Sequence, residues 1–172
     1  MVKKPADPAN GSVSATRQVP MRDFSRSLPM SLLRAREAVM RQFRPKLREH
    51  GLTEQQWRIL RALAAIEAAE VTELARTAFL LGPSLSRILR DLEARNLIER
   101  KTAKTDQRRS MVSISKEGVK LMASVAPSSE AIYAEITQRF GARKLAELQE
   151  MLGELEQSLT GLGGGDGAGA DE

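Results

Sequence analysis

The fold is decided by the stretch from Pro83 to Gly118, which reads PSLSRILRDLEARNLIERKTAKTDQRRSMVSISKEG. In its first part, leucine and isoleucine fall on one arc of a helical projection, while proline, serine and arginine fall on the opposite arc. Two short segments follow, 97–101 and 110–115, which have the pattern of paired strands joined by eight residues rich in Lys, Thr, Asp and Arg. This order predicts the recognition helix and the basic wing of a winged helix-turn-helix, a unit that binds duplex DNA.

Helices are also expected immediately before this stretch. Thr53 and Gln56 have the spacing of a capping box at the start of a helix. Residues 71–78 predict a short helix, and a turn precedes Pro83, because proline suits the first turn of a helix. Residues 51–116 are therefore expected to form one winged helix-turn-helix DNA-binding domain.

The residues expected to contact DNA have short or cationic side chains on the outer face of the recognition helix and at the wing tip. Arg87 and Arg90 can each donate two hydrogen bonds to a guanine edge. Arginines at the wing tip suit a narrow minor groove, and Asp106 is expected to orient one of them through a charge-assisted hydrogen bond. The expected DNA-binding set is Pro83, Ser84, Ser86, Arg87, Arg90, Lys104, Asp106, Arg108 and Arg109. A solvated helix face and an ordinary charged loop are the alternative interpretations of the same residues.

The charge of the chain is unevenly distributed. The net charge is +5 over 172 residues, which favours a polyanionic partner. Residues 71–116 hold ten Lys and Arg against five Asp and Glu, while residues 117–172 hold four against ten. The middle of the chain should therefore attract DNA, and its C-terminal part should face away from a duplex.

The composition excludes several classes of function. The chain has no cysteine, which excludes disulfides and thiolate metal sites, and it has a single histidine, His50. No nucleophile–base pair and no glycine-rich phosphate loop can be assembled from its residues. We therefore expect no enzyme, no cofactor and no metal. No apolar run approaches the length of a membrane span, so we expect a cytoplasmic protein with no membrane partner.

Helical segments flank the expected DNA-binding domain. Residues 28–50 have a helical apolar stripe that Pro45 is expected to kink or interrupt, and residues 117–160 predict a long helix followed by a final one. The final helix has leucines at alternating spacings of 3 and 4, a heptad pattern suited to packing against another helix. These two segments are therefore expected to build a dimerisation bundle. The outermost segments, a basic N-terminal arm at 1–27 and a Gly-rich tail at 161–172, are expected to be disordered and flexible.

Several segments resemble the MarR family of bacterial transcriptional regulators. They are LTEQQWRIL at 52–60, PSLSRIL at 83–89 and TDQRR at 105–109. RAREA at 34–38 and HGLTEQQW at 50–57 are most similar to the subgroup that represses homoprotocatechuate catabolism. The resemblance covers about residues 28–160. It implies a homodimer with two winged-helix lobes, interlocked terminal helices, and repression relieved by a small aromatic ligand.

The first two expected helices carry a candidate site for such a ligand. An aromatic carboxylate needs a flat apolar wall and a cation that donates two hydrogen bonds. Trp57 with a nearby arginine can supply both. The candidate ligand-binding residues are Arg34, Arg36, His50, Trp57 and Arg61, with Arg58 in the same cluster. The alternative is a core tryptophan beside solvated or ion-paired arginines.

These observations lead to one main prediction and two alternatives. The expected fold is mainly α (α+β): a winged helix-turn-helix whose N- and C-terminal helices form a dimerisation bundle. The expected function is a dimeric repressor of aromatic-catabolism genes that binds a double-stranded DNA operator and is released by a small aromatic acid. The alternatives are a DNA-binding regulator without ligand response, and a winged-helix module that binds an acidic protein.

Overall fold

A computed structural model of the chain describes residues 23–103 and 106–160, with the backbone alone for residues 102, 103 and 106–109. The chain divides into two compact units, Met1–Glu37 and Ala38–Glu172, and the boundary falls inside helix α1 (Leu28–Glu49). The tail predicted at 161–172 lies outside the described residues, as does most of the predicted N-terminal arm.

The described part of the first unit begins with a short 3-10 helix, η1 (Phe24–Arg26). Asp23 caps it, because its Oδ1 atom accepts hydrogen bonds from the backbone nitrogen of Ser25 at 2.7 Å and from the hydroxyl of Ser25 at 2.6 Å. These two donors stabilise the carboxylate and lower the pKa of Asp23. The prediction of a disordered arm up to residue 27 did not include this ordered turn.

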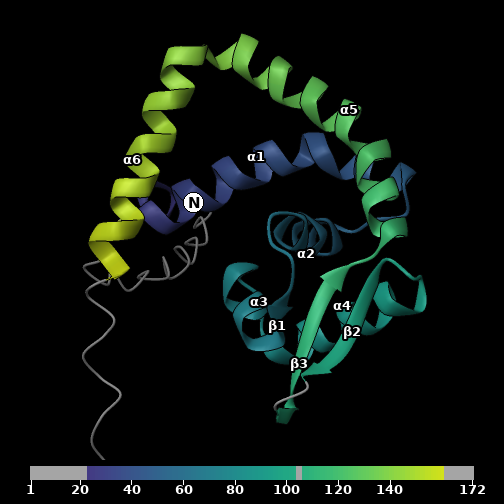
Figure 1. Cartoon of the computed structure of the whole chain (residues 1–172). Coiled ribbons are helices and arrows are strands. Elements are labelled where there is room, and N and C mark those ends of the chain that lie inside the picture. Colours follow the sequence, from purple (N-terminus) through teal and green to yellow (C-terminus); the bar gives the residue numbers. More distant parts are fainter. Residues whose placement is uncertain (1–22, 104–105, 161–172) are drawn as a thin grey trace, which may run out of the picture. The chain divides into compact units, whose positions relative to one another are not determined.

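The second unit holds the remaining elements and the C-terminal half of α1 (Figure 1). In chain order they are α2 (Glu54–Ala64), β1 (Ala69–Glu70), α3 (Val71–Thr77), α4 (Gly82–Ala94), β2 (Ile98–Ala103), β3 (Asp106–Ile114), α5 (Lys116–Phe140) and α6 (Ala142–Thr160). This is the order of a winged helix-turn-helix followed by two long helices, so the predicted fold class is confirmed.

The core of this unit is aliphatic and lies between the helices and the sheet. On α4, Leu85, Leu89 and Leu92 are fully buried, which confirms the predicted apolar arc. Ile59, Leu60 and Leu63 of α2 belong to the same buried cluster. Because the leucines of α4 occupy one side of the helix, its serine and arginine side chains are left on the outside.

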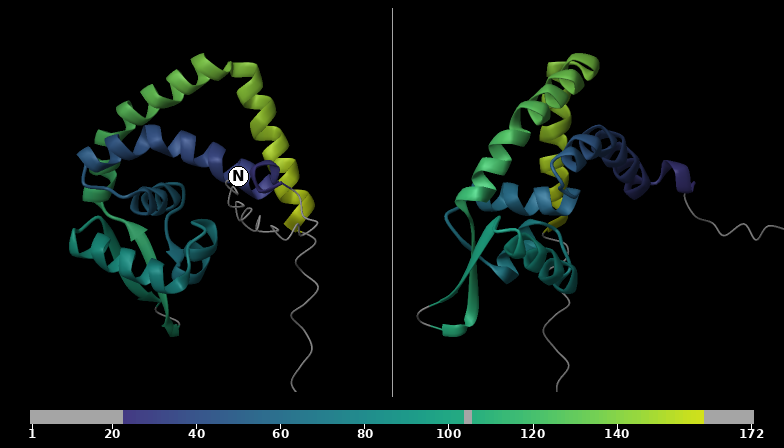
Figure 2. Two further views of the ribbon diagram at one scale, coloured as in Figure 1. Left: turned by 180° about the vertical axis from the view of Figure 1, so that it is seen from behind. Right: turned by 90° about the vertical axis from the view of Figure 1, so that its right-hand side faces the viewer.

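Three antiparallel strands form the sheet, in the order β1-β3-β2. The β2–β3 hairpin projects away from helices α2 to α4 (Figure 2, right). Its strands are longer than the predicted 97–101 and 110–115, since pairing continues to Thr102 opposite Ser110 and, after a bulge, to Ala103 opposite Asp106. The prediction was too short because it relied on apolar alternation, which a ribbon needs only where one face is buried.

Helix α1 continues through Pro45, so of the two expected effects of this proline, a kink or an interruption, the interruption does not occur. Proline removes one backbone hydrogen bond, which alone would favour a break. Here Phe43 and Leu47, on either side of the proline, are both buried in the core, and Arg44 is bound to the next helix by Glu54. Tertiary packing of the flanking residues therefore outweighs the local cost.

Candidate nucleic-acid interface

The outer face of α4 is exposed along its whole length. Pro83 occupies the first turn of the helix, and Ser84, Ser86, Arg87 and Arg90 all lie exposed on the surface. These are the residues that the sequence predicted for this face. The helix thus presents short side chains near its N-terminus and two guanidinium groups one turn apart, a pattern suited to the major groove.

The two arginines of this face differ in their surroundings. The Nε atom of Arg90 lies 3.4 Å from the carbonyl oxygen of Ser86 in the same helix. Within the described part of the chain, Arg87 has neither a hydrogen-bond nor an ion-pair partner. All five donors of the Arg87 guanidinium are therefore available to a ligand.

A groove of about 570 Å³ lies beside Arg87, between the start of α2 and α4. Its lining residues are Thr53, Gln55, Gln56, Leu80, Ser84, Arg87, Ile88 and Asp91. The carboxylate of Asp91 accepts a hydrogen bond from Gln56 Nε2 at 2.5 Å, and Gln56 Oε1 accepts one from the backbone nitrogen of Thr53 at 2.8 Å. The predicted capping box is therefore present, and the same glutamine fixes α4 against the start of α2.

A second polar network fixes the turn that leads into α4. Glu54 Oε2 accepts hydrogen bonds from Nε and Nη2 of Arg44 at 3.1 and 3.0 Å, and Glu54 Oε1 accepts one from Arg58 Nη2 at 2.9 Å. Arg58 Nη1 also donates to the carbonyl oxygen of Ala78 at 2.8 Å. The sequence placed Arg58 in the effector cluster, but here it connects α1 and α2 to the α3–α4 turn.

The base of the wing is joined to α4 by an ion pair. Arg100 of β2 lies 3.4 Å from the carboxylate of Glu93, near the C-terminus of α4. The wing residues predicted to contact DNA lie outside the described residues, wholly or in their side chains: Lys104, Asp106, Arg108 and Arg109. The backbone of β3 begins at Asp106, so the last three of these belong to the strand rather than to a loop.

The candidate effector residues fall into separate groups. Arg34 and Arg36 belong to the first unit, where Arg34 donates to the carbonyl oxygen of Ser25 at 2.6 Å and Arg36 pairs with Glu37 at 2.9 Å. In the second unit, the Arg61 guanidinium carbon lies 6.0 Å from the ring centre of Trp57, and this contact joins two members of the set. His50 contacts a residue outside the set, since its Nδ1 atom lies 3.3 Å from the hydroxyl of Ser124.

Three residues of α1 and α5 were not among the predicted site residues. Phe43 of α1 and Tyr133 of α5 form an aromatic pair with ring centres 5.0 Å apart and planes inclined by 60°. Ser129, one turn before Tyr133, is only 4% exposed, and its hydroxyl has no hydrogen-bond partner among the described residues. The only sequence signal was that Tyr133 is the single tyrosine of the chain.

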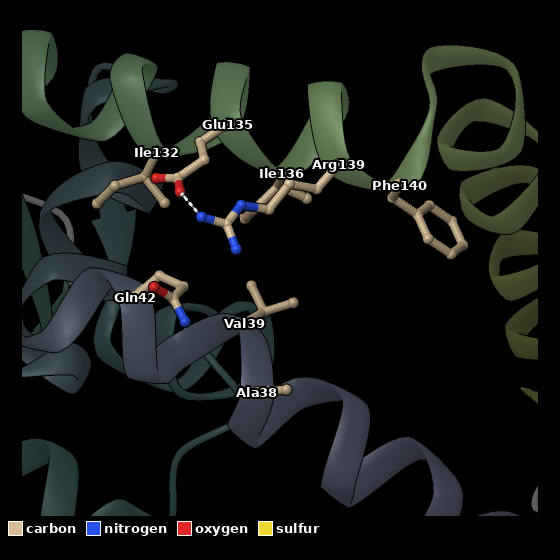
Figure 3. A pocket seen from close by; sticks show the side chains of 8 residues that line it. All are labelled: Ala38, Val39, Gln42, Ile132, Glu135, Ile136, Arg139 and Phe140. Atoms are coloured by element: carbon tan, nitrogen blue, oxygen red, sulfur yellow. Dashed lines mark hydrogen bonds and ion pairs between the residues drawn. The ribbon is translucent and has the colours of Figure 1, made fainter.

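A pocket of about 220 Å³ separates the C-terminal half of α1 from α5 (Figure 3). Its lining residues are Ala38, Val39, Gln42, Ile132, Glu135, Ile136, Arg139 and Phe140. Most of this lining is apolar, and the Arg139 guanidinium bridges to Glu135 at 2.5 Å within it. An open apolar pocket of this kind is where a further helix or ligand can bury its surface.

The helix α4 with its exposed arginines, the supporting helices and the hairpin together define a winged helix-turn-helix of the DNA-binding kind. A family model for the MarR family matches residues 50–109. The homoprotocatechuate degradative operon repressor of Escherichia coli is 41% identical over 129 residues, which cover 75% of this chain and 87% of that protein. The chain therefore belongs to the MarR family of transcriptional regulators.

Two solved structures extend the comparison. NadR in complex with 4-hydroxyphenylacetate is 37% identical, with a TM-score of 0.69 and coverage of 80% of this chain and 97% of that one. The transcriptional repressor CouR bound to a 23-mer DNA duplex is 26% identical, with a TM-score of 0.71 and coverage of 77% and 94%. Since the relatives are regulators, the expectation that the chain is not an enzyme is confirmed. No helix among the described residues is long and apolar enough to cross a bilayer.

Proposed function

We propose that this chain is a homodimeric repressor that binds a pseudo-palindromic operator upstream of aromatic-catabolism genes and is released by a small aromatic acid. The observation that carries the DNA-binding part is the outer face of α4, where Arg87 lies exposed beside Ser84 and has no partner among the described residues. Two such helices related by a two-fold axis enter successive major grooves about 34 Å apart. The names of the E. coli repressor and of the DNA-bound CouR support this choice.

The dimeric part of the proposal rests on apolar surface that a single chain leaves uncovered. Helix α6 buries none of its residues, and Met151, Leu152 and Leu159 are exposed on it. Phe140 at the end of α5 is exposed beside the pocket of Figure 3. A second copy of the chain would cover this surface, because monomeric proteins rarely leave large apolar patches in water.

The experiment that tests the function measures duplex binding as salt is varied. We expect the protein to bind a labelled duplex from the region upstream of its own gene or of the neighbouring genes at least about 1,000-fold more tightly than a scrambled duplex. The logarithm of the affinity should fall linearly with the logarithm of the salt concentration, with a slope of about −0.9 for each phosphate neutralised. If no duplex from that region is bound more tightly than the scrambled one, the alternative of a protein-binding winged helix gains support instead.

The effector part of the proposal uses the Trp57–Arg61 pair. The Arg61 guanidinium lies over the indole ring of Trp57, 6.0 Å from its centre, and the two groups together could hold the carboxylate and the ring of an aromatic acid. The 4-hydroxyphenylacetate bound to NadR is a compound of this chemistry. Ligand binding would favour a spacing of the two lobes that no longer fits both half-sites, so that the operator is released.

Tryptophan fluorescence provides a direct test, because Trp57 is the only tryptophan of the chain. Titration with 4-hydroxyphenylacetate is expected to change the Trp57 emission and to weaken operator binding over the same concentration range. Arg61→Gln should weaken ligand binding by about tenfold or more, since a charge-assisted pair is lost, while Arg143→Gln on α6 should have no effect. The absence of both responses across a panel of phenolic and phenylacetic acids would favour the regulator without ligand response.

A further inference from the structure

Two residues in the turn between α3 and α4, Phe79 and Leu81, depart from the residue types usually found at their positions. Phe79 has a φ of +50°, in the left-handed region, where Asn96 is the only other described residue besides glycine. Asparagine tolerates this region, whereas a bulky aromatic residue there is an outlier. Leu81 is the N-cap of α4 and makes no side-chain hydrogen bond to the helix, although Ser, Thr, Asp and Asn are the preferred residues at that position.

The backbone of the turn explains where the strain is held. The backbone nitrogen of Phe79 donates to the carbonyl oxygen of Arg76 at 3.2 Å, and that of Leu80 donates to Ala75 at 3.0 Å. These bonds end α3 with a residue in the left-handed conformation, a position that glycine usually takes. The hydrogen bond from Arg58 to Ala78 holds the turn from the other side. The turn is therefore well fixed, and the unusual residue in it is not a sign of a loose segment.

Core packing does not account for the two residues. The Phe79 side chain is 79% exposed and that of Leu81 is 78% exposed. By contrast, Ala78, which precedes Phe79, is buried, and Leu80, which lies between the two, packs against the core. Both residues thus depart from the locally preferred residue type, and neither side chain gains burial in the core in return. Such local violations are expected where a surface is selected for binding.

The occupant that fits this surface is the operator duplex. The two residues directly precede the N-terminal turn of α4, whose residues contact base edges in helix-turn-helix complexes. The exposed Arg76 at the end of α3 and Arg87 on α4 place cations on either side of the turn in the sequence, as a polyanion requires. The apolar group that the major groove offers at its base edges is the C5-methyl group of thymine.

We propose that Phe79 and Leu81 contact thymine methyl groups where α4 enters the major groove, and that they specify thymine in each half-site. This inference rests on the proposed function, since it needs an operator. Two properties follow. Changing either residue to the locally preferred type should stabilise the fold, and the same change should weaken operator binding.

The test combines a thermal measurement with binding to two versions of one duplex. Phe79→Gly and Leu81→Ser are expected to raise the melting temperature by about 2–4 °C each, by relief of the left-handed strain and by provision of a cap. Loss of one methyl contact corresponds to about fourfold in affinity per half-site, so each variant dimer should bind the operator about 15-fold more weakly. Phe79→Asn, which also tolerates the left-handed conformation, should give the same loss without the flexibility of glycine. Val119→Ala, which shortens an exposed apolar side chain on α5, is the control and should change neither property.

Replacement of thymine by uracil in the operator removes the C5-methyl groups alone. The wild type, which loses both contacts in each half-site on this duplex, should lose about 200-fold in affinity, while Phe79→Gly and Leu81→Ser, which each have one contact per half-site left to lose, should lose about 15-fold. If the wild type binds the operator but both variants bind it equally well, or lose as much as the wild type on the uracil duplex, the thymine contact is wrong. If the wild type shows no operator binding at all, the proposed function itself fails.

Discussion

Replacement of Gly118 by alanine is expected to destabilise the fold by about 3 kcal/mol, because the added methyl group has no room. A Cβ atom at this position would lie 2.2 Å from the carbonyl oxygen of Leu97 and 2.8 Å from Cγ1 of Ile114. The nearest of these atoms belongs to the backbone, so it cannot move aside as the end of a flexible side chain would.

The surroundings of Gly118 explain why the backbone cannot yield. The Gly118 nitrogen donates to the hydroxyl of Ser115 at 2.9 Å, and that hydroxyl donates to the carbonyl oxygen of Asn96 at 2.6 Å. The backbone nitrogen of Ser115 also donates to the carbonyl oxygen of Leu97 at 3.1 Å. Helix α5 is thus fixed to the junction of α4 and β2, and a methyl group between them would separate the long helices from the DNA-binding lobe.

Gly153 is the matched control for this substitution. It also lies inside a helix, α6, but a Cβ atom there would meet nothing within 4 Å. Gly153→Ala should therefore leave stability unchanged or raise it by about 0.5–1 kcal/mol, the usual difference between glycine and alanine in a helix. Urea denaturation followed by circular dichroism measures the free energy of unfolding of both variants.

If Gly118→Ala does not fold, Ser115→Ala tests the same junction, with an expected loss of stability of about 1–2 kcal/mol. A loss below about 1 kcal/mol for Gly118→Ala would show that the junction is not rigid.

Local patterns predicted the parts of this fold that depend on neighbouring residues. The capping box of Thr53 and Gln56 and the apolar arc of α4 could be found from spacing, because the atoms involved lie within two turns of one helix. The same reasoning could not decide between a kink and an interruption at Pro45, and the helix is not interrupted there. Its effect on α1 depends on the burial of Phe43 and Leu47 by elements far away in the sequence.

The residue types of the candidate site could be predicted from the sequence, but the interactions that hold α4 in place could not. Arginine and serine on the outer arc of α4 follow from the buried arc beneath them. That Gln56 donates to Asp91, and that Arg58 donates to the backbone carbonyl oxygen of Ala78, depends on groups 35 and 20 residues apart, and no spacing rule connects these. Phe79 could not be predicted as a site residue for a related reason, because the sequence shows that it is apolar but shows neither its exposure nor its φ.

Arg87→Ala is expected to weaken operator binding by about 100-fold or more. A bidentate contact from arginine to guanine contributes about 1–3 kcal/mol of discrimination, and a dimer loses this contact in both half-sites. The structure makes Arg87 the better choice than Arg90, because Arg90 Nε is close to the carbonyl oxygen of Ser86 and Arg87 has no partner among the described residues. Arg143→Ala on α6 removes the same charge away from the DNA-binding lobe and should change binding by less than about twofold. Both variants should sediment as the wild type does.

The comparison of two duplexes decides what Arg87 contacts. A base contact predicts that Arg87→Ala loses affinity for the operator but hardly any for a scrambled duplex, and that the slope of affinity against salt concentration stays nearly constant. A phosphate contact predicts an equal loss on both duplexes and a salt slope smaller by about 1 for each phosphate released, about 2 for the dimer. Fluorescence anisotropy at three or more salt concentrations distinguishes the two outcomes. An equal loss on both duplexes would mean that Arg87 positions α4 on the DNA backbone, and that base recognition must then come from Ser84, Ser86 and the turn that precedes them.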